Sequence, residues 1–127
     1  MELGNALNWF EIPVVDFDRA KKFYETIFDY QMPENQMGEA RMGFFLYDFQ
    51  NGKVGGAIVH RPGFHVPNTE GTLVYLNCQP DLQLVLNRVK GAGGTEVHPK
   101  TNIGEGLGYW ALIFDTEGNR VALHSMG

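Results

Sequence analysis

The chain contains a single cysteine, Cys78, so no disulfide bond can form within it. Structural disulfides belong to oxidising compartments, and a lone cysteine therefore fits a reducing one. Long apolar runs are also missing. A helix that crosses a bilayer needs roughly 20 apolar residues, and no stretch of the chain approaches that length. Residues 1–8 lack the basic start and the apolar segment of a secretory signal. These features predict a cytoplasmic protein that does not bind membranes.

Positive charge is scarce as well. Ten Lys and Arg residues face fifteen Asp and Glu residues, which gives a net charge of −5 spread over both halves of the chain. Proteins that bind nucleic acids normally carry a basic patch or tail, so we expect no nucleic-acid partner. The glycines between Gly104 and Gly108 are not followed by a lysine-serine pair or by a helix, and this excludes a phosphate-binding loop of the Walker type.

Aromatic residues, glycine and proline, in contrast, are plentiful. The 127 residues are 43% hydrophobic and 13% aromatic, which suffices for one globular domain with a sizeable core. Sixteen glycines and six prolines predict many turns and short strands rather than a helical bundle.

The first half of the chain begins with the pattern of a strand followed by a helix. Residues 9–15 alternate in character, as in a half-buried strand. Asp16 or Asp18 can cap the helix that follows, and the apolar residues at helical spacing are Ala20, Phe23, Tyr24, Ile27 and Phe28. Residues 30–38 then predict a loop or a poor edge strand, and Asn51-Gly52 predicts a hairpin turn between strands at 41–49 and 53–60.

The second half repeats this order after a linker rich in proline and glycine at residues 61–71. The expected elements are a strand at 72–78, a helix at 81–92 and strands at 95–100, 109–115 and 120–125. The sequence therefore predicts an α+β fold of two paired βαβββ modules that form a cupped mixed sheet. Their bounds are residues 1–62 and 70–127, and a cavity between them is the expected place for a ligand.

Three segments of the chain resemble motifs of a known superfamily. They are the pattern from Ile12 to Tyr24, which includes Asp16, the glycines from Gly91 to Gly94, and the run from Phe114 to Val121. Their order and spacing are similar to those of the vicinal oxygen chelate superfamily, which includes glyoxalase I, the bleomycin-resistance proteins and the extradiol dioxygenases. The resemblance implies paired βαβββ modules and, commonly, a homodimer.

Many members of that superfamily hold a divalent metal through His, Glu or Gln at four strand positions. Aligned by motif, those positions carry Trp9, Ala57 or a neighbour, Leu73 and Ala122 in this chain. None of these side chains can coordinate a hard or borderline cation. The alignment therefore predicts no metal ligands and no cofactor at the usual site.

Two titratable residues are candidates for chemistry. Glu11 lies in an otherwise apolar strand on the same face as Trp9, and a carboxylate there is costly unless it is paired or wet. It is either a general base or a residue that pairs with Arg41, Arg120 or a linker amide. His124 shares the face of Ala122 and is either an acid or base that works with Glu11 or a partly exposed histidine near the end of the chain.

We also expect a ligand pocket lined by aromatic side chains. For each of these residues the alternative is ordinary packing in the core. We expect the remaining histidines to lie at the surface or at an interface, and Cys78 to be a small buried apolar residue. The residues expected to line the pocket are Trp9, Phe45, Tyr75, Asn77, Tyr109 and Trp110.

Three functional hypotheses remain open from the sequence. The first is a protein that binds a small organic molecule in this cavity without the usual metal. The second is a lyase or isomerase that uses Glu11 and His124, with or without a non-standard metal. The third is a protein that sequesters a drug or toxin without turnover.

Overall fold

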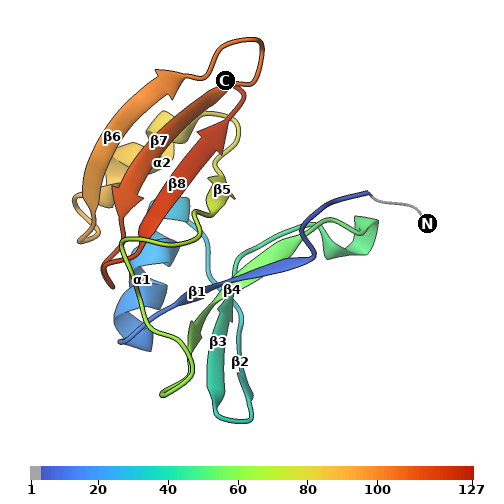
Figure 1. Ribbon diagram of the computed structural model, residues 1–127, viewed down its shortest axis with the longest axis vertical. Coiled ribbons are helices and arrows are strands. Elements are labelled where there is room, and N and C mark those ends of the chain that lie inside the picture. The colour runs from blue at the N-terminus through green and yellow to red at the C-terminus, as the bar shows by residue number, and fades with distance from the viewer. Residues whose placement is uncertain (1–3) are drawn as a thin grey trace.

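The computed structural model describes residues 4–127 and consists of two halves with the same order of elements (Figure 1). The predicted order β-α-β-β-β, occurring twice, is confirmed, although residues 1–3 of the first predicted module lie outside the described residues. The first half comprises β1 (Trp9–Pro13), α1 (Phe17–Phe28), β2 (Glu34–Met37), β3 (Ala40–Phe44), the short helix η1 (Phe49–Asn51) and β4 (Gly55–His60). The second comprises β5 (Tyr75–Asn77), α2 (Leu82–Val89), β6 (Thr95–Asn102), β7 (Tyr109–Phe114) and β8 (Arg120–Ser125).

Each half builds its own four-stranded mixed sheet. The strand orders are β1-β4-β3-β2 and β5-β8-β7-β6. The β1–β4 and β5–β8 pairs are parallel and the other pairs are antiparallel. Strands β1 and β5 are therefore edge strands, and Figure 1 shows the two sheets as separate layers at an angle to each other.

The helices start where aspartates cap them. The side chain of Asp16, rather than Asp18, accepts a hydrogen bond from the Arg19 N–H (3.1 Å), and Asp81 accepts one from the Gln83 N–H (2.9 Å). Such a cap satisfies a donor that the first helical turn leaves unpaired. Helix α2 packs on β6, β7 and β8, while α1 contacts α2 and β4, so side chains from both helices and both sheets join in one buried core.

A polar cluster ties the two halves together. Glu117, in the β7–β8 turn, accepts hydrogen bonds from the Val15 N–H (3.0 Å) and the Asp16 N–H (2.7 Å), and its carboxylate pairs with Arg19 (2.7 Å). Burial opposes ionisation of Glu117, but these hydrogen bonds outweigh it and hold the pKa of the carboxyl at about 2. The β7–β8 turn of the second half thus binds the N-terminal end of α1 in the first half.

The connection between β3 and β4 differs from the prediction. The expected strand at 41–49 ends at Phe44, and Asn51-Gly52 closes the short helix η1 instead of a hairpin turn. The chain leaves the sheet because Phe45 turns into the core, where it is 7% exposed. The weak segment at 30–38 does contain an edge strand, β2, and all four of its residues are exposed.

Neither helix between residues 4 and 127 has the length and apolar character needed to traverse a lipid bilayer.

Candidate ligand-binding cleft

A large cleft lies between the two halves and is lined by residues of both edge strands, β1 and β5. Its volume is about 1070 Å³. Both faces of β1 reach it, since Trp9, Phe10, Glu11 and Pro13 all contribute to its walls. From the second half it is lined mainly by residues 72–77, and from the linker by Val66, Asn68 and Glu70. A cleft of this size between two modules is a common place for a small molecule.

Two adjacent glycines set the aromatic wall of the cleft. A Cβ atom at Gly55 would overlap the ring of Tyr47, and one at Gly56 would overlap the ring of Phe10. Both rings therefore lie directly on the backbone of β4. Tyr47 also meets Trp9 edge-on, with ring centroids 6.1 Å apart. The Gly55-Gly56 pair thus holds aromatic surface at the cleft.

The inner end of the cleft is formed by aromatic side chains around the end of α1. Phe28 and Tyr30 are stacked, with centroids 5.5 Å apart and planes 14° apart. The Leu46 N–H donates to Tyr30 Oη (3.2 Å), and burial raises the pKa of the Tyr30 hydroxyl. Phe45 packs against Phe10 at 5.5 Å. This region offers a neutral, apolar surface to a ligand.

Charged and polar groups stand along the rest of the lining. Glu11, Asp48 and Glu70 supply carboxylates, and Lys53 supplies the one ammonium group among the residues that line the cleft. Tyr75 is 54% exposed and adds a hydroxyl from β5. A ligand with an apolar body and a few polar substituents would match this combination.

A second, smaller cleft of about 440 Å³ lies on the outer face of the first sheet. It is lined by Met42, Phe44 and Val59 together with Arg61 and Phe64 of the linker, among others. Trp9 and Glu11 line both clefts. The wall between the two clefts is therefore built from β1 and the linker.

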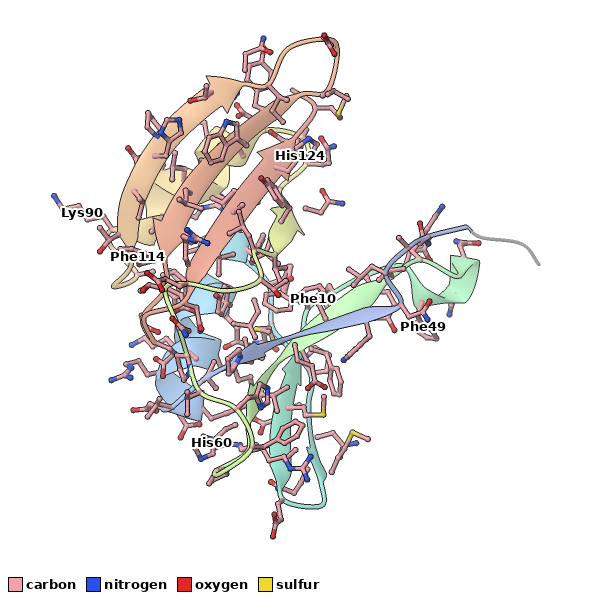
Figure 2. The ribbon with its side chains drawn as sticks, viewed as in Figure 1. Phe10, Phe49, His60, Lys90, Phe114 and His124 are labelled. Atoms are coloured by element: carbon pink, nitrogen blue, oxygen red, sulfur yellow. The ribbon has the colours of Figure 1, made fainter. Side chains whose placement is uncertain are left out.

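Glu11 and His124, the two candidate catalytic residues, lie on different sheets. Glu11 is on β1, whereas His124 is on β8 and lines neither cleft. The ring nitrogen Nε2 of His124 donates to the Leu107 carbonyl oxygen (2.8 Å). Figure 2 shows His124 near the C-terminal end of β8, away from Phe10 on β1. Within one chain the two residues are not brought together.

The predicted pocket residues divide into two groups. Trp9, Phe45, Tyr75 and Asn77 line the large cleft. Tyr109 and Trp110 do not, because β7 lies in the interior of the second sheet. The ring of Trp110 stacks on His98 at 4.5 Å, and the amino group of Lys100 lies 4.5 Å from the centre of the Tyr109 ring.

Several residues at the clefts were missed from the sequence. Phe10 packs against the core, and the edge position of β1 also opens it to the cleft. Tyr47 was placed in a strand, and nothing in the sequence indicated that its ring folds onto Gly55. His65 had no distinguishing pattern, yet its Nε2 lies 4.0 Å from Glu11 Oε1. No sequence signal could have found that pair, because it depends on the path of the linker.

The side chains at the four ligand positions do not fit the metal centre that many members of the vicinal oxygen chelate superfamily hold. Ala57 and Ala122 are fully buried methyl groups in the strand interiors, and Leu73 and Trp9 line the large cleft without a ligating atom. Among residues 4–127, no three His, Cys, Asp or Glu side chains come together as a group able to hold a metal ion. Cys78 is buried, and burial raises the pKa of its thiol to about 12, so the thiol is protonated at neutral pH.

Comparisons with known proteins agree with this architecture. A family model described as Glyoxalase/Bleomycin resistance protein/Dioxygenase superfamily matches residues 6–123. A search of curated proteins gives no significant match.

Solved structures with the same fold share little sequence with the chain. A glyoxalase I variant from Zea mays has a TM-score of 0.68 at 16% identity, over 94% of this chain and 46% of the maize chain, so this chain spans about half the length of that relative. A glyoxalase/bleomycin resistance protein from Albidiferax ferrireducens has a TM-score of 0.66 at 15% identity, over 95% and 98% of the two chains. The fosfomycin resistance protein FosX from Listeria monocytogenes has a TM-score of 0.64 at 16% identity, over 98% and 92%. Because the family model covers nearly the whole chain, the protein belongs to the Glyoxalase/Bleomycin resistance protein/Dioxygenase superfamily.

Proposed function

We propose that the protein binds a small organic molecule in the large cleft and does so without the metal centre that many superfamily members use. The observation that carries this proposal is the cleft of about 1070 Å³ between the modules, with an aromatic wall placed on Gly55 and Gly56. The absence of ligating atoms at Trp9, Ala57, Leu73 and Ala122 supports the metal-free part.

The lining favours a particular kind of ligand. Trp9, Tyr47 and Tyr75 offer ring faces and edges to a planar or apolar body. Carboxylates outnumber ammonium groups in the lining, which favours a neutral or cationic ligand over an anion. Binding of this kind needs no proton transfer and is compatible with a cleft that has no catalytic pair.

The test is a thermal-shift screen against a panel of small metabolites and aromatic amines, followed by calorimetry on any compound that stabilises the fold. A ligand that binds only the native state raises the unfolding temperature. Tyr75→Ala should weaken binding, whereas Leu84→Ala should leave it unchanged. Both side chains are about equally exposed, at 54% and 52%, but only Tyr75 lines the cleft. A panel without a single stabilising compound, or equal binding by the Tyr75 variant, would count against the proposal.

We also propose that the protein is a cytoplasmic homodimer, as is common in the superfamily. Its support is the uncovered apolar surface beside the smaller cleft, where Met37 of β2 and Phe64 of the linker are 56% and 60% exposed. Light scattering on the purified protein should give twice the chain mass of 14.3 kDa. A mass of one chain at micromolar concentration would refute the dimer.

Sequestration of a drug or toxin is the nearest alternative. It is supported by the family description, which includes bleomycin resistance proteins, and by the structural likeness to a protein described as a fosfomycin resistance protein. It requires the same cleft and differs only in the ligand. Expression that raises a host's tolerance of a compound that also stabilises the protein in vitro would support this use. The lyase or isomerase hypothesis stays a prediction: Glu11 and His124 lie on different sheets of one chain, so their cooperation would need two chains.

A further inference from the structure

Each sheet has two edge strands, and the edges away from the large cleft are built to resist pairing with a further strand. Strand β2 has only four residues, all of them exposed. Strand β6, which Figure 1 shows at the opposite margin of its sheet from β5, contains Pro99 and Lys100, and two register shifts interrupt its pairing with β7. Short length, proline, lysine and bulges are features that keep an edge from accepting another strand. The edges of β1 and β5, in contrast, line the large cleft and have an unbroken register.

The open edge of β1 presents the backbone groups of Trp9 and Glu11. The Val14 N–H donates to a carbonyl oxygen of β4 (2.9 Å), so the even-numbered residues of this strand direct their backbone groups toward β4. Successive residues direct these groups to opposite edges, and the odd-numbered residues therefore face away from β4. The Pro13 carbonyl oxygen on that edge accepts from Asn119 Nδ2 (2.7 Å). In the described part of the chain, the N–H and C=O groups of Trp9 and Glu11 have no such partner.

Strand β5 has the same arrangement over a shorter length. The Cys78 N–H donates to the His124 carbonyl oxygen (2.8 Å), so the backbone groups of Tyr75 and Asn77 face the open edge. This strand has three residues, whereas β1 has five. A strand that joins the protein in the cleft therefore finds the longer template in β1.

The side chains beside the β1 edge indicate what an added strand must carry. Trp9 and Glu11 lie on one side of the first sheet, whereas Phe10 lies on the other side and packs on the core. The Glu11 carboxylate attracts a cation, and the face of the Trp9 ring can accept one. Phe10 and the aromatic inner end of the cleft favour apolar side chains. The edge thus matches a strand that is basic on one face and apolar on the other.

We propose that the large cleft takes an extended cationic peptide, which adds to the open edge of β1 as an antiparallel strand. A peptide backbone supplies the alternating donors and acceptors that this edge lacks, and the side chains on its two faces supply specificity. Antiparallel pairing is the more stable kind. The peptide residues opposite Trp9 and Glu11 are basic, and those between them are apolar. This assignment rests on the proposed ligand binding in the cleft and names the class of ligand.

The probe is a pentapeptide of alternating lysine and valine, capped at both ends, that begins and ends with lysine. Amide hydrogen exchange of the ¹⁵N-labelled protein reports whether each N–H is paired. Without peptide, the Trp9 and Glu11 amides should exchange rapidly, whereas those of Phe10 and Ile12, which face β4, should be protected. At a peptide concentration about ten times its Kd, exchange at Trp9 and Glu11 should slow about tenfold, because these amides are open only in the unbound fraction.

Two methylated peptides of equal charge separate strand pairing from ionic attraction. The lysine opposite Glu11 exchanges both backbone hydrogen bonds with it, so N-methylation of the lysine amides removes the donors that face β1. N-methylation of the valine amides changes only the other edge of the peptide. The valine-methylated peptide should slow exchange at Trp9 and Glu11, and the lysine-methylated peptide should not. Equal effects of the two peptides would show attraction of charge alone and would overturn the proposal.

Variants test the edge from the side of the protein. Glu11→Pro removes an N–H that faces the cleft and keeps the β1–β4 hydrogen bonds, so it should fold but lose the peptide. Glu11→Gln keeps the N–H and should bind more weakly, with its amide still protected on binding. Glu96→Gln, which removes an exposed carboxylate from β6, should bind as the unmodified protein does. Amides of β8 report folding, and the methylated peptides decide the matter if Glu11→Pro does not fold.

Three results in the unmodified protein would overturn the proposal. They are unchanged exchange at the highest soluble peptide concentration, protection confined to Tyr75 and Asn77, and protection of Trp9 and Glu11 before peptide is added, since a second copy would then occupy the edge. A shift of the Trp9 indole signal without protection of these amides would refute strand addition and leave ligand binding in the cleft intact. The thermal-shift screen tests that binding separately.

Discussion

The Tyr24 hydroxyl donates a hydrogen bond of 2.7 Å to Asp115 Oδ2, and this contact joins the helix of the first module to the final turn of the second. Tyr24 is completely buried and Asp115 is 5% exposed. Burial, together with the nearby Asp115 charge, raises the pKa of Tyr24 well above its ordinary value, so the phenol is a neutral donor at neutral pH. The remaining lone pairs of Asp115 accept from the backbone of Glu117 and Asn119 and from the Asn119 side chain.

Tyr24→Phe should destabilise the protein by about 1–2 kcal/mol, because it removes a donor from a buried carboxylate while keeping the ring. Urea denaturation of the variant measures this difference. Tyr75→Phe is the control, since the Tyr75 side chain is 54% exposed and makes no hydrogen bond within residues 4–127, and it should change stability little. A Tyr24→Phe variant as stable as the unmodified protein would show that the contact does not hold the modules together.

Acid should weaken the link between the modules through Glu117. Its pKa lies at about 2 in the folded protein, against an ordinary value of 4.5. The folded state therefore binds this proton less readily than the unfolded chain, and the stabilisation is fully present above pH 4.5 and lost as the pH falls toward 2. The loss should be of the order of 2 kcal/mol, as measured by urea denaturation across this range.

Glu117→Gln should remove that part of the pH dependence and lower stability at neutral pH. Glu39→Gln, which changes an exposed carboxylate in the β2–β3 turn without an ion pair, should retain it. If both variants keep the same acid dependence, Glu117 is not its source.

Gly55→Ala should weaken ligand binding more than it destabilises the fold. Its Cβ would displace the Tyr47 ring from β4, at a cost of about 1–3 kcal/mol for an overpacked site. We expect a lowered melting temperature and a larger proportional loss of binding to any compound that stabilises the unmodified protein. Gly91→Ala is the matched control, because nothing lies within 4 Å of a Cβ at that position. Full binding by Gly55→Ala would show that the Tyr47 ring does not take part.

The purified protein should contain no stoichiometric zinc, nickel, manganese or iron, and a chelator should not lower its melting temperature. The reason is that the four superfamily ligand positions carry an indole, two methyl groups and an isobutyl group. Elemental analysis measures the content directly. About one metal ion per chain would mean that other side chains, supplied by this chain or by a second copy, form a site.

The fold was largely predictable because its signals are local. The helical spacing from Ala20 to Phe28, the aspartate cap of the first helix and the repeated βαβββ order all depend on neighbouring residues, and the structure confirms them, with Asp16 as the cap. The β3–β4 connection was predicted wrongly because Asn51-Gly52 favours a turn locally, whereas the burial of Phe45 and the seat of Tyr47 on Gly55 depend on distant packing. Strand alternation put Glu11, Trp9, Tyr75 and Asn77 on the faces where they lie, but it could not tell that β1 and β5 are edge strands that border one cleft. The Glu11–His65 contact depends on the course of the linker at residues 61–71 and left no sequence pattern.

The two tryptophans of the chain allow the central claim to be tested in one spectrum. Trp9 lines the large cleft, whereas Trp110 stacks on His98 in the second sheet and lines neither cleft. A compound found in the thermal-shift screen would be titrated into ¹⁵N-labelled protein while the two indole N–H signals are followed. Binding in the cleft predicts a saturable shift of the Trp9 signal and an unchanged Trp110 signal. A shift confined to Trp110 would place the ligand on the second sheet and contradict the assignment of the cleft as the binding site.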